Sequence, residues 1–310
     1  MCPLCAHPDP LSLLAGPDRF NGRHTQYQLL RCSACSIVWL YDPPQPAAMG
    51  EHYGSDYDRT IAAASQAPDH WIPRRTELSR LKSGGSILDL GCGAGGFLST
   101  MKGPDWKLYG IEMSEGAASM ARERCGAEVF VGDVLDAKFP PASFDAITAF
   151  NVMEHVYEPR EVLARVAEWL KPDGVFYAMM PNIDSAGAHI FRSYWYALEL
   201  PRHLYHFSPA TFKAVAQSAG LQEVSVTAHR ELYFEFSFRY VIDNLLSKIG
   251  ITRTPLARAK EPGLLFKIVR KAFRLTFLPL FTAAASLVGD GETITAVLTR
   301  GSAQESNRRQ

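Results

Sequence analysis

A glycine-rich turn between an apolar segment and a helix-like segment places the tightest limit on what this chain can fold into. Residues 86–90 read Ser-Ile-Leu-Asp-Leu, and glycines follow at Gly91, Gly93, Gly95 and Gly96. Glycine is favoured where the backbone bends sharply and where a ligand must approach the main chain closely. Because a strand, a glycine-rich turn and a helix in this order open a βαβ unit, the segment predicts an α/β fold.

Two further strand-like segments follow the turn, and both carry an acidic residue at their end. Residues 107–112 end at Glu112, and residues 129–134 contain Asp133. Glu112 lies about twenty residues after the turn, the spacing at which a carboxylate can accept hydrogen bonds from both hydroxyls of a ribose. Asp133 is placed to accept a hydrogen bond from an adenine amino group beside that ribose. The sequence therefore predicts a site for a cofactor that contains adenosine.

Strand-like and helix-like segments continue to alternate farther along the chain. Strands are expected within residues 144–156 and near residues 174–182, and an amphipathic helix that begins near Pro159 separates them. This alternation predicts further βα units in the same sheet.

Five motifs together resemble those of class I S-adenosylmethionine methyltransferases over about residues 86 to 230. They are Ile87-Leu-Asp-Leu-Gly-Cys-Gly-Ala-Gly95, Glu112, Gly132-Asp133, Asn151-Val-Met-Glu-His155 and Leu170-Lys-Pro-Asp-Gly174. The resemblance implies a Rossmann-like seven-stranded sheet, with residues 221–229 and 292–299 as its last two strands. It also implies S-adenosyl-L-methionine as the cofactor, at the carboxyl ends of the first strands. The residues expected to contact that cofactor are Asp89, Gly91, Gly93, Gly95, Glu112, Met113, Asp133, Val134 and Asn151.

An NAD-dependent oxidoreductase is the main alternative among cofactor-binding enzymes. Its dinucleotide motif also combines a glycine-rich turn with an acid at the end of the next strand. The third glycine of the Gly-x-Gly-x-x-Gly pattern is present here at Gly96, so the glycines do not separate the two classes. Asp89 and the later motifs carry the distinction, and they favour the methyltransferase.

Four cysteines near the start of the chain form two Cys-x-x-Cys pairs. The pairs are Cys2 with Cys5 and Cys32 with Cys35, and a polar loop separates them. The sequence shows no signal peptide, so we expect a reducing, cytoplasmic compartment in which metal explains paired cysteines better than disulfides do. The spacing is that of a zinc ribbon and predicts a closed, structural Zn²⁺ site. A catalytic zinc or a docking surface for a partner is the less favoured interpretation.

The expected acceptor follows from a second, looser resemblance. The four-cysteine front and residues 199–209 are similar to a subgroup of bacterial methyltransferases that act on sugars, lipids or secondary metabolites. We therefore expect a small-molecule acceptor, such as a sugar, a secondary metabolite or a lipid-linked glycan, with oxygen as the attacking atom. The candidate bases are His155, His203 and His206, because each follows a strand at the carboxyl edge of the sheet. A hydrogen-bonded structural imidazole is the alternative for each, and His203 or His206 is favoured over His155.

An insertion separates the sixth and seventh expected strands. It contains about sixty residues, too many for an ordinary connection within a sheet. Residues 264–289 mix apolar side chains with Lys267, Arg270, Lys271 and Arg274, a pattern that fits a membrane surface. A helical cap over the active site, or a contact in a homodimer, is the favoured interpretation.

These features predict five parts in the chain. In order they are a zinc-ribbon-like module (1–45), a helical linker or lid (46–85), the methyltransferase core (86–235 and 291–300), a hydrophobic helical insertion (236–290) and a disordered tail (301–310).

Charge and composition limit the remaining function classes. Lysine and arginine number 32, as do aspartate and glutamate, so no net field favours nucleic acid and none is expected as a partner. The expected location is the cytoplasm, or the inner membrane surface if the insertion lies there.

The rival function from another class is a non-catalytic module. Such a module would bind a partner through the zinc ribbon and keep the cofactor pocket only as structure. The presence of Asp89, Glu112 and Asp133 argues against it.

Overall fold

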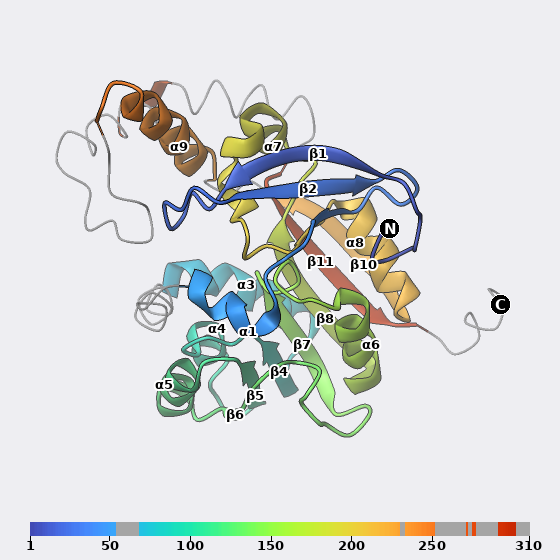
Figure 1. The fold of residues 1–310 in the computed structure, drawn as a ribbon. Coiled ribbons are helices and arrows are strands. Elements are labelled where there is room, and N and C mark those ends of the chain that lie inside the picture. The colour runs from blue at the N-terminus through green and yellow to red at the C-terminus, as the bar shows by residue number, and fades with distance from the viewer. Residues whose placement is uncertain (54–67, 230–232, 252–270, 272–274, 277–290, 302–310) are drawn as a thin grey trace. The chain divides into compact units, whose positions relative to one another are not determined.

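The computed structural model describes residues 1–53, 68–229, 233–251, 271, 275–276 and 291–301 (Figure 1). The chain forms two compact units. The first consists of Met1–Gly54, Pro181–Thr211 and Ala228–Ile294. The second consists of Ser55–Met180, Phe212–Thr227 and Thr295–Gln310.

A seven-stranded sheet lies in the second unit, apart from the ends of three of its strands. Its strands are β4 (Gly85–Leu90), β5 (Trp106–Glu112), β6 (Glu128–Val131), β7 (Phe144–Phe150), β8 (Leu170–Pro181), β10 (Leu221–His229) and β11 (Thr293–Arg300). Their order is β10-β11-β8-β7-β4-β5-β6, and the pairs from β8 through to β6 are parallel. The seven-stranded Rossmann-like fold expected from the sequence is confirmed. One difference is that β8 begins at Leu170, four positions before the expected Gly174.

Helices cover both faces of this sheet, which explains why most residues of its central strands β4, β7 and β8 are buried. Helices α3 (Pro68–Leu81), α4 (Gly96–Thr100) and α5 (Glu115–Cys125) lie on one face, and α6 (Pro159–Trp169) and α8 (Pro209–Ser218) lie on the other (Figure 1). The core between the first group and the sheet contains Ile87, Phe97, Leu108, Tyr177 and Val297. Helix α6 begins at the predicted Pro159, because proline at the first helical position lacks only an amide that has no partner there.

Local signals define the turn between β5 and α5, which positions Glu112. The Ser114 side chain caps α5 by accepting a hydrogen bond from the Ala117 amide at 3.2 Å. The helix ends at Gly126, whose φ of 74° is the left-handed conformation that glycine adopts at helix ends. These two caps fix the start and the end of the helix that follows the acidic strand end.

The first unit contains a four-stranded sheet in the order β1-β2-β3-β9. Its strands are β1 (Pro10–Pro17), β2 (Gln26–Cys32), β3 (Val38–Leu40) and β9 (Tyr205–His206), and all three pairings are antiparallel. The unit also contains α1 (Pro46–Met49), η1 (Gly50–His52), α7 (Ala186–Phe191), η2 (Arg192–Tyr194), η3 (Tyr196–Leu198) and α9 (Tyr233–Ser247). The strand β9 was not expected from the sequence, because a two-residue strand has no periodicity that could reveal it.

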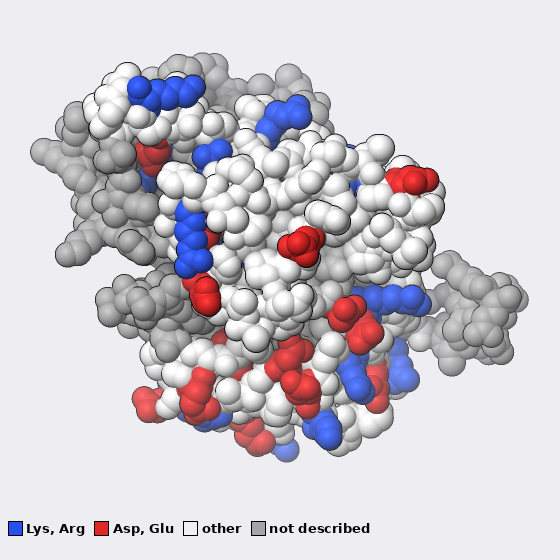
Figure 2. All heavy atoms as spheres, viewed as in Figure 1, with Lys and Arg blue, Asp and Glu red and all other residues white. Residues whose placement is uncertain are grey.

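Parts of the expected lid, insertion and tail lie outside the described residues. They are residues 54–67, 252–270, 272–274, 277–290 and 302–310, so the amphipathic pattern over 264–289 is almost wholly among them. Across the described part of the chain, no helix is both long enough and apolar enough to cross a membrane. Figure 2 shows acidic and basic side chains interspersed on the described part of the face in view, in keeping with the balanced charge of the sequence.

Candidate functional site

The glycine-rich turn connects β4 to α4 in a conformation that requires glycine. Gly91, Gly93 and Gly95 have φ angles of 61°, 52° and 73°, which side chains with a Cβ rarely adopt. A Cβ on Gly91 would lie 2.7 Å from Val152 Cγ2, and one on Gly95 would lie 3.0 Å from Ala121 Cα. Gly91 and Gly95 therefore let the turn pass close to the segment after β7 and to α5.

The substitution Gly91→Ala tests this account of the turn. We expect it to lower the free energy of unfolding by about 1 to 2 kcal/mol, because the new methyl group meets Val152 and the backbone is left-handed there. Gly103→Ala is the matched control, since a Cβ at Gly103 would have nothing within 4 Å. Urea denaturation of both variants measures the difference. Equal midpoints for the two variants would contradict the account.

Glu112 lies at the end of β5 and holds the turn in place. Its side chain is 4% exposed, and its two carboxylate oxygens accept hydrogen bonds from different segments. Oε2 accepts from the Gly93 amide at 2.9 Å, and Oε1 accepts from the Ser114 amide at 2.9 Å. An ionised carboxylate has about four lone-pair positions, more than these two amides use. The strand end and the glycine turn are thus joined through one acid.

Asp89 is the second buried acid in this region. It is 3% exposed, and the Thr148 hydroxyl donates a hydrogen bond of 2.6 Å to its Oδ1. Burial raises the pKa of Asp89 to about 7, the charge of Glu112 adds to the rise, and the hydrogen bond from Thr148 opposes it. Asp89 and Glu112 are thus two buried carboxylates next to the glycine-rich turn.

The remaining residues expected to contact the cofactor follow the strand ends of the same unit. Asp133 is exposed and accepts a hydrogen bond from the Leu135 amide at 2.8 Å, Val134 is buried and Met113 is 70% exposed. Asn151 is exposed just after β7, and its φ of 55° is a conformation that asparagine tolerates better than most residues. All of the expected cofactor residues therefore belong to the second unit, at the ends of β4, β5, β6 and β7.

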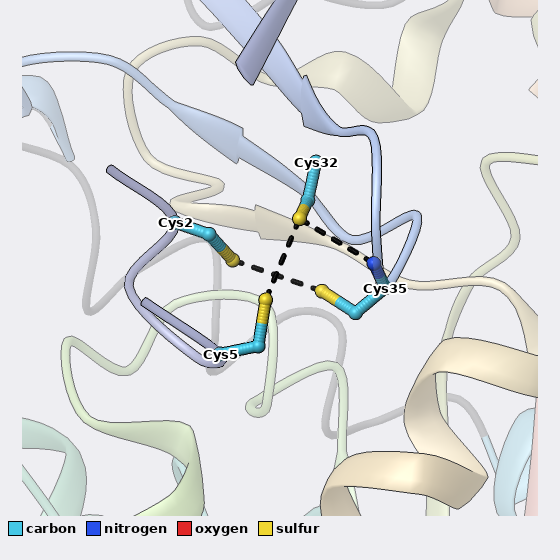
Figure 3. Close-up of side chains that lie close together, drawn as sticks. All are labelled: Cys2, Cys5, Cys32 and Cys35. Carbon is cyan, nitrogen blue, oxygen red and sulfur yellow. Dashed lines mark hydrogen bonds between the residues drawn. The ribbon is translucent and has the colours of Figure 1, made fainter. Parts of the chain in front are cut away.

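The four paired cysteines converge in the first unit (Figure 3). The Cys2 and Cys35 sulfurs are 3.7 Å apart, and the Cys5 and Cys32 sulfurs are 3.5 Å apart. Four thiolates at about 2.3 Å from a tetrahedral Zn²⁺ ion would lie about 3.8 Å from one another. The donor set and its spacing therefore fit one zinc ion.

The three candidate histidines lie in different environments. His203 is 4% exposed, its Nδ1 is 2.8 Å from the Ala197 carbonyl oxygen, and its Nε2 is 3.5 Å from Glu199 Oε2. Burial lowers the pKa of His203 well below its usual value, and the charges of His206 and Arg202 lower it further. His206 is 3% exposed within β9, whereas His155 is half-buried in the second unit. His203 and His206 both belong to the first unit.

Thr148 is a residue of the site that the sequence did not single out. It lies directly opposite Asp89 in the parallel pairing of β4 with β7, and this places its hydroxyl on the buried carboxylate. The signal that could have identified it is the order of the strands. A single sequence does not give that order directly, because β4 and β7 are not consecutive in the chain.

The sheet order, the glycine turn and the acids at successive strand ends define a class of Rossmann-like enzymes that bind a nucleoside cofactor. A family model described as a methyltransferase domain matches residues 63–226, more than half of the chain. The chain belongs to this methyltransferase family, and it is an S-adenosylmethionine-dependent methyltransferase.

Two relatives illustrate the similarity in sequence. The ubiquinone biosynthesis O-methyltransferase of Thiobacillus denitrificans is 29% identical over 175 residues, which cover 51% of this chain and 71% of the relative. The demethylmenaquinone methyltransferase of Symbiobacterium thermophilum is 25% identical over 158 residues, which cover 45% of this chain and 62% of the relative.

Solved structures support the fold. One similar structure is a chain from the complex between the Trm112 methyltransferase activator and a methyltransferase of Haloferax volcanii, with a TM-score of 0.54, 18% identity, and coverage of 79% of this chain and 96% of that one. Another is phosphoethanolamine N-methyltransferase 2 of Haemonchus contortus with S-adenosyl-L-methionine, with a TM-score of 0.54, 16% identity, and coverage of 85% and 63%. At these identities the likeness concerns the fold.

Proposed function

We propose that this methyltransferase transfers the methyl group of S-adenosyl-L-methionine to a hydroxyl oxygen of a small-molecule acceptor. The acceptor class is a sugar, a secondary metabolite or a lipid-linked glycan. The observation that supports S-adenosyl-L-methionine as the cofactor is the pair of buried carboxylates, Asp89 and Glu112, beside the glycine turn. Relatives whose names include O-methyltransferase support oxygen as the attacking atom.

Each acidic residue has a separate proposed role toward the cofactor. Glu112 accepts hydrogen bonds from the two ribose hydroxyls, and Asp133 accepts one from the adenine amino group. Asp89 faces the positively charged part of the molecule, which carries a sulfonium and an ammonium group. Gly91, Gly93 and Gly95 let the backbone of the turn approach the cofactor closely, because they carry no side chain.

Methyl transfer needs little acid-base chemistry from the protein. An oxygen lone pair of the acceptor attacks the methyl carbon while the bond from carbon to sulfur breaks, and the sulfur keeps that electron pair. Because the sulfonium already activates the methyl group, catalysis rests mainly on holding donor and acceptor in line. The acceptor hydroxyl also loses a proton, and His155, His203 or His206 is the proposed base.

The three histidines can be separated by kinetics. Replacing the base by asparagine or glutamine should lower the turnover number at saturating cofactor and leave the Kd of S-adenosylmethionine unchanged. Replacing a histidine that only supports the fold should lower thermal stability instead. The buried contacts of His203 with Ala197 and Glu199 support a positioning role for that residue. Radiolabelled methyl transfer to panels of sugars, phenols and lipid extracts identifies the acceptor needed for this test.

Cofactor binding should depend on pH through Asp89. The pKa of Asp89 is about 7 in the ligand-free protein, so below pH 7 the side chain is mostly protonated and must lose its proton to face a cation. We expect the affinity for S-adenosylmethionine to rise about tenfold between pH 6 and pH 8. Asp89→Asn should bind more weakly and lack this dependence. Calorimetry in buffers of different ionisation enthalpy measures the released proton, and the same pH profile in both proteins would exclude Asp89 as its source.

We propose that the four cysteines hold a structural Zn²⁺ ion. Cys2, Cys5, Cys32 and Cys35 supply four thiolates, which complete the coordination that structural zinc prefers and leave no position for a substrate. The chemistry that zinc supplies there is cross-linking of two turns, not catalysis.

A further inference from the structure

The segment of residues 199–206 carries His203 and His206. It is hydrogen-bonded to the sheet of the four-cysteine module. In the pairing of β3 with β9, Val38 lies opposite His206 and Trp39 lies opposite Tyr205. The Leu40 amide extends this ladder by donating to the Leu204 carbonyl oxygen at 2.8 Å. The first three strands of the sheet come from the front of the chain, and the fourth comes from a segment more than 160 positions later.

The strand β3 is joined directly to the cysteine site. The turn between β2 and β3 carries Cys32 and Cys35, and the Cys32 amide donates to the Ile37 carbonyl oxygen at 2.9 Å. The Ser36 amide closes the same turn by donating to the Cys32 carbonyl oxygen at 3.0 Å. All three side chains of β3 are buried, so this strand has little freedom to shift independently of the turn.

Two further contacts tie the module to later parts of the same unit, and the second of them reaches residues 199–206. The Arg19 Nε donates to the Ser193 carbonyl oxygen at 3.0 Å. The Arg202 guanidinium lies 3.9 Å from the centre of the Phe20 ring, and it forms an ion pair of 2.6 Å with Glu199. Cation–π contacts depend on geometry, so a displaced Phe20 would remove one of the contacts that hold Arg202.

From these contacts we propose that the four-cysteine module positions the segment of residues 199–206, and with it His203 and His206. A metal ion on the four thiolates fixes the turn between β2 and β3, and that turn sets the place of β9. The inference rests on the proposed zinc site and the proposed role of the histidines. Trp39 and Phe20 contact this segment and not the reacting atoms, so they are positioning residues.

The segment needs such support because its own strand is short. A net contribution of about 1 kcal/mol per hydrogen bond is small compared with the entropy of ordering two residues. A two-residue strand therefore depends in part on a neighbour that is held in place. Release of the metal should free β9 and leave the strand ends that carry Asp89 and Glu112 unaffected, because these belong to the other unit.

Hydrogen–deuterium exchange of the full-length protein tests the coupling. The zinc-loaded protein is compared with the same protein after treatment with 1,10-phenanthroline. We expect peptides that cover residues 199–208 to exchange about tenfold faster or more after metal removal. Peptides that cover β4 and β5 should be unchanged, and the Kd of S-adenosylmethionine should stay within about twofold, which shows that the cofactor site survives.

The substitution Trp39→Ala separates the coupling from general unfolding. It keeps all four cysteines and removes the buried side chain opposite Tyr205, so exchange over residues 199–208 should rise while zinc is retained. Trp106→Ala is the matched control, because it makes the same change on β5 in the other unit. If metal removal raises exchange over the whole chain, the comparison of these two variants still tests whether β3 positions residues 199–208.

Two results would overturn the inference. One is faster exchange over residues 1–36 after metal removal with no change over residues 199–208. The other is unchanged exchange over residues 199–208 in Trp39→Ala. The inference would also fail if the purified protein held no zinc, because its first step is a metal ion on the four cysteines. Failure of the proposed function would appear separately, as no cofactor binding or no methyl transfer by the zinc-loaded natural protein, neither of which depends on the exchange over residues 199–208.

Discussion

Glu112→Ala should weaken the binding of S-adenosylmethionine by about 2 to 4 kcal/mol, which corresponds to roughly 30- to 1000-fold in Kd. The reason is twofold. The substitution removes the carboxylate that is proposed to accept hydrogen bonds from the ribose, and it leaves the Gly93 and Ser114 amides without the acceptor that holds them at 2.9 Å. The turn that should surround the cofactor then loses its anchor. Equilibrium dialysis with labelled cofactor measures the change.

Glu115→Ala is the matched control for this prediction. Glu115 lies three residues farther along, is exposed, and forms an ion pair of 2.8 Å with Arg122. Its removal should leave the Kd within about twofold, because an exposed ion pair contributes little. Circular dichroism establishes that both variants are folded. A Kd in Glu112→Ala equal to that of the control would refute the proposed ribose contact.

Cys32→Ser should abolish zinc binding and destabilise the four-cysteine module. Structural zinc contributes on the order of 10 kcal/mol to the folding of small zinc modules, and a serine hydroxyl is a poor substitute for a thiolate. Cys32 is buried at the end of β2, so the loss should spread to that strand and to β3. Elemental analysis should find about one zinc ion per chain in the natural protein and almost none in the variant.

Cys125→Ser makes the same chemical change at a buried cysteine away from the four. The Cys125 thiol donates to the Ala121 carbonyl oxygen at 3.2 Å, so a serine can keep that contact. This control should retain its zinc and most of its thermal stability. Equal zinc content in Cys32→Ser and Cys125→Ser would mean that the four cysteines do not form the metal site.

The parts of the fold that sequence reasoning predicted share one property, which is a strong local signal. The glycines at positions 91, 93 and 95 are required by left-handed backbone, and Pro159 begins α6 where its missing amide has no cost. The strand end at Glu112 follows from a short, largely apolar run bounded by a turn, whereas the strand that begins at Phe144 ends at Phe150, earlier than expected. These signals concern neighbouring residues, so they can be read without knowing what packs against them.

The parts that were not predicted depend on pairing between distant segments. Thr148 becomes part of the site only because β7 pairs with β4, and β9 exists only because β3 provides a neighbour for it. The buried contacts of His203 with Ala197 and Glu199 are likewise set by the fold of the loop, and the residue type alone gave no indication of them. Local patterns thus predicted the glycine-rich turn and the strand ends more completely than the surroundings of the histidines.

The most direct test of the central claim is calorimetric titration of the zinc-loaded protein with S-adenosylmethionine and, separately, with NADH. The arrangement of Asp89 and Glu112 around the glycine turn predicts saturable heat with about one binding site per chain for the former and no heat for the latter. Binding of NADH, or no heat with S-adenosylmethionine in a protein shown to be folded, would contradict the assignment of this site to the methyl donor.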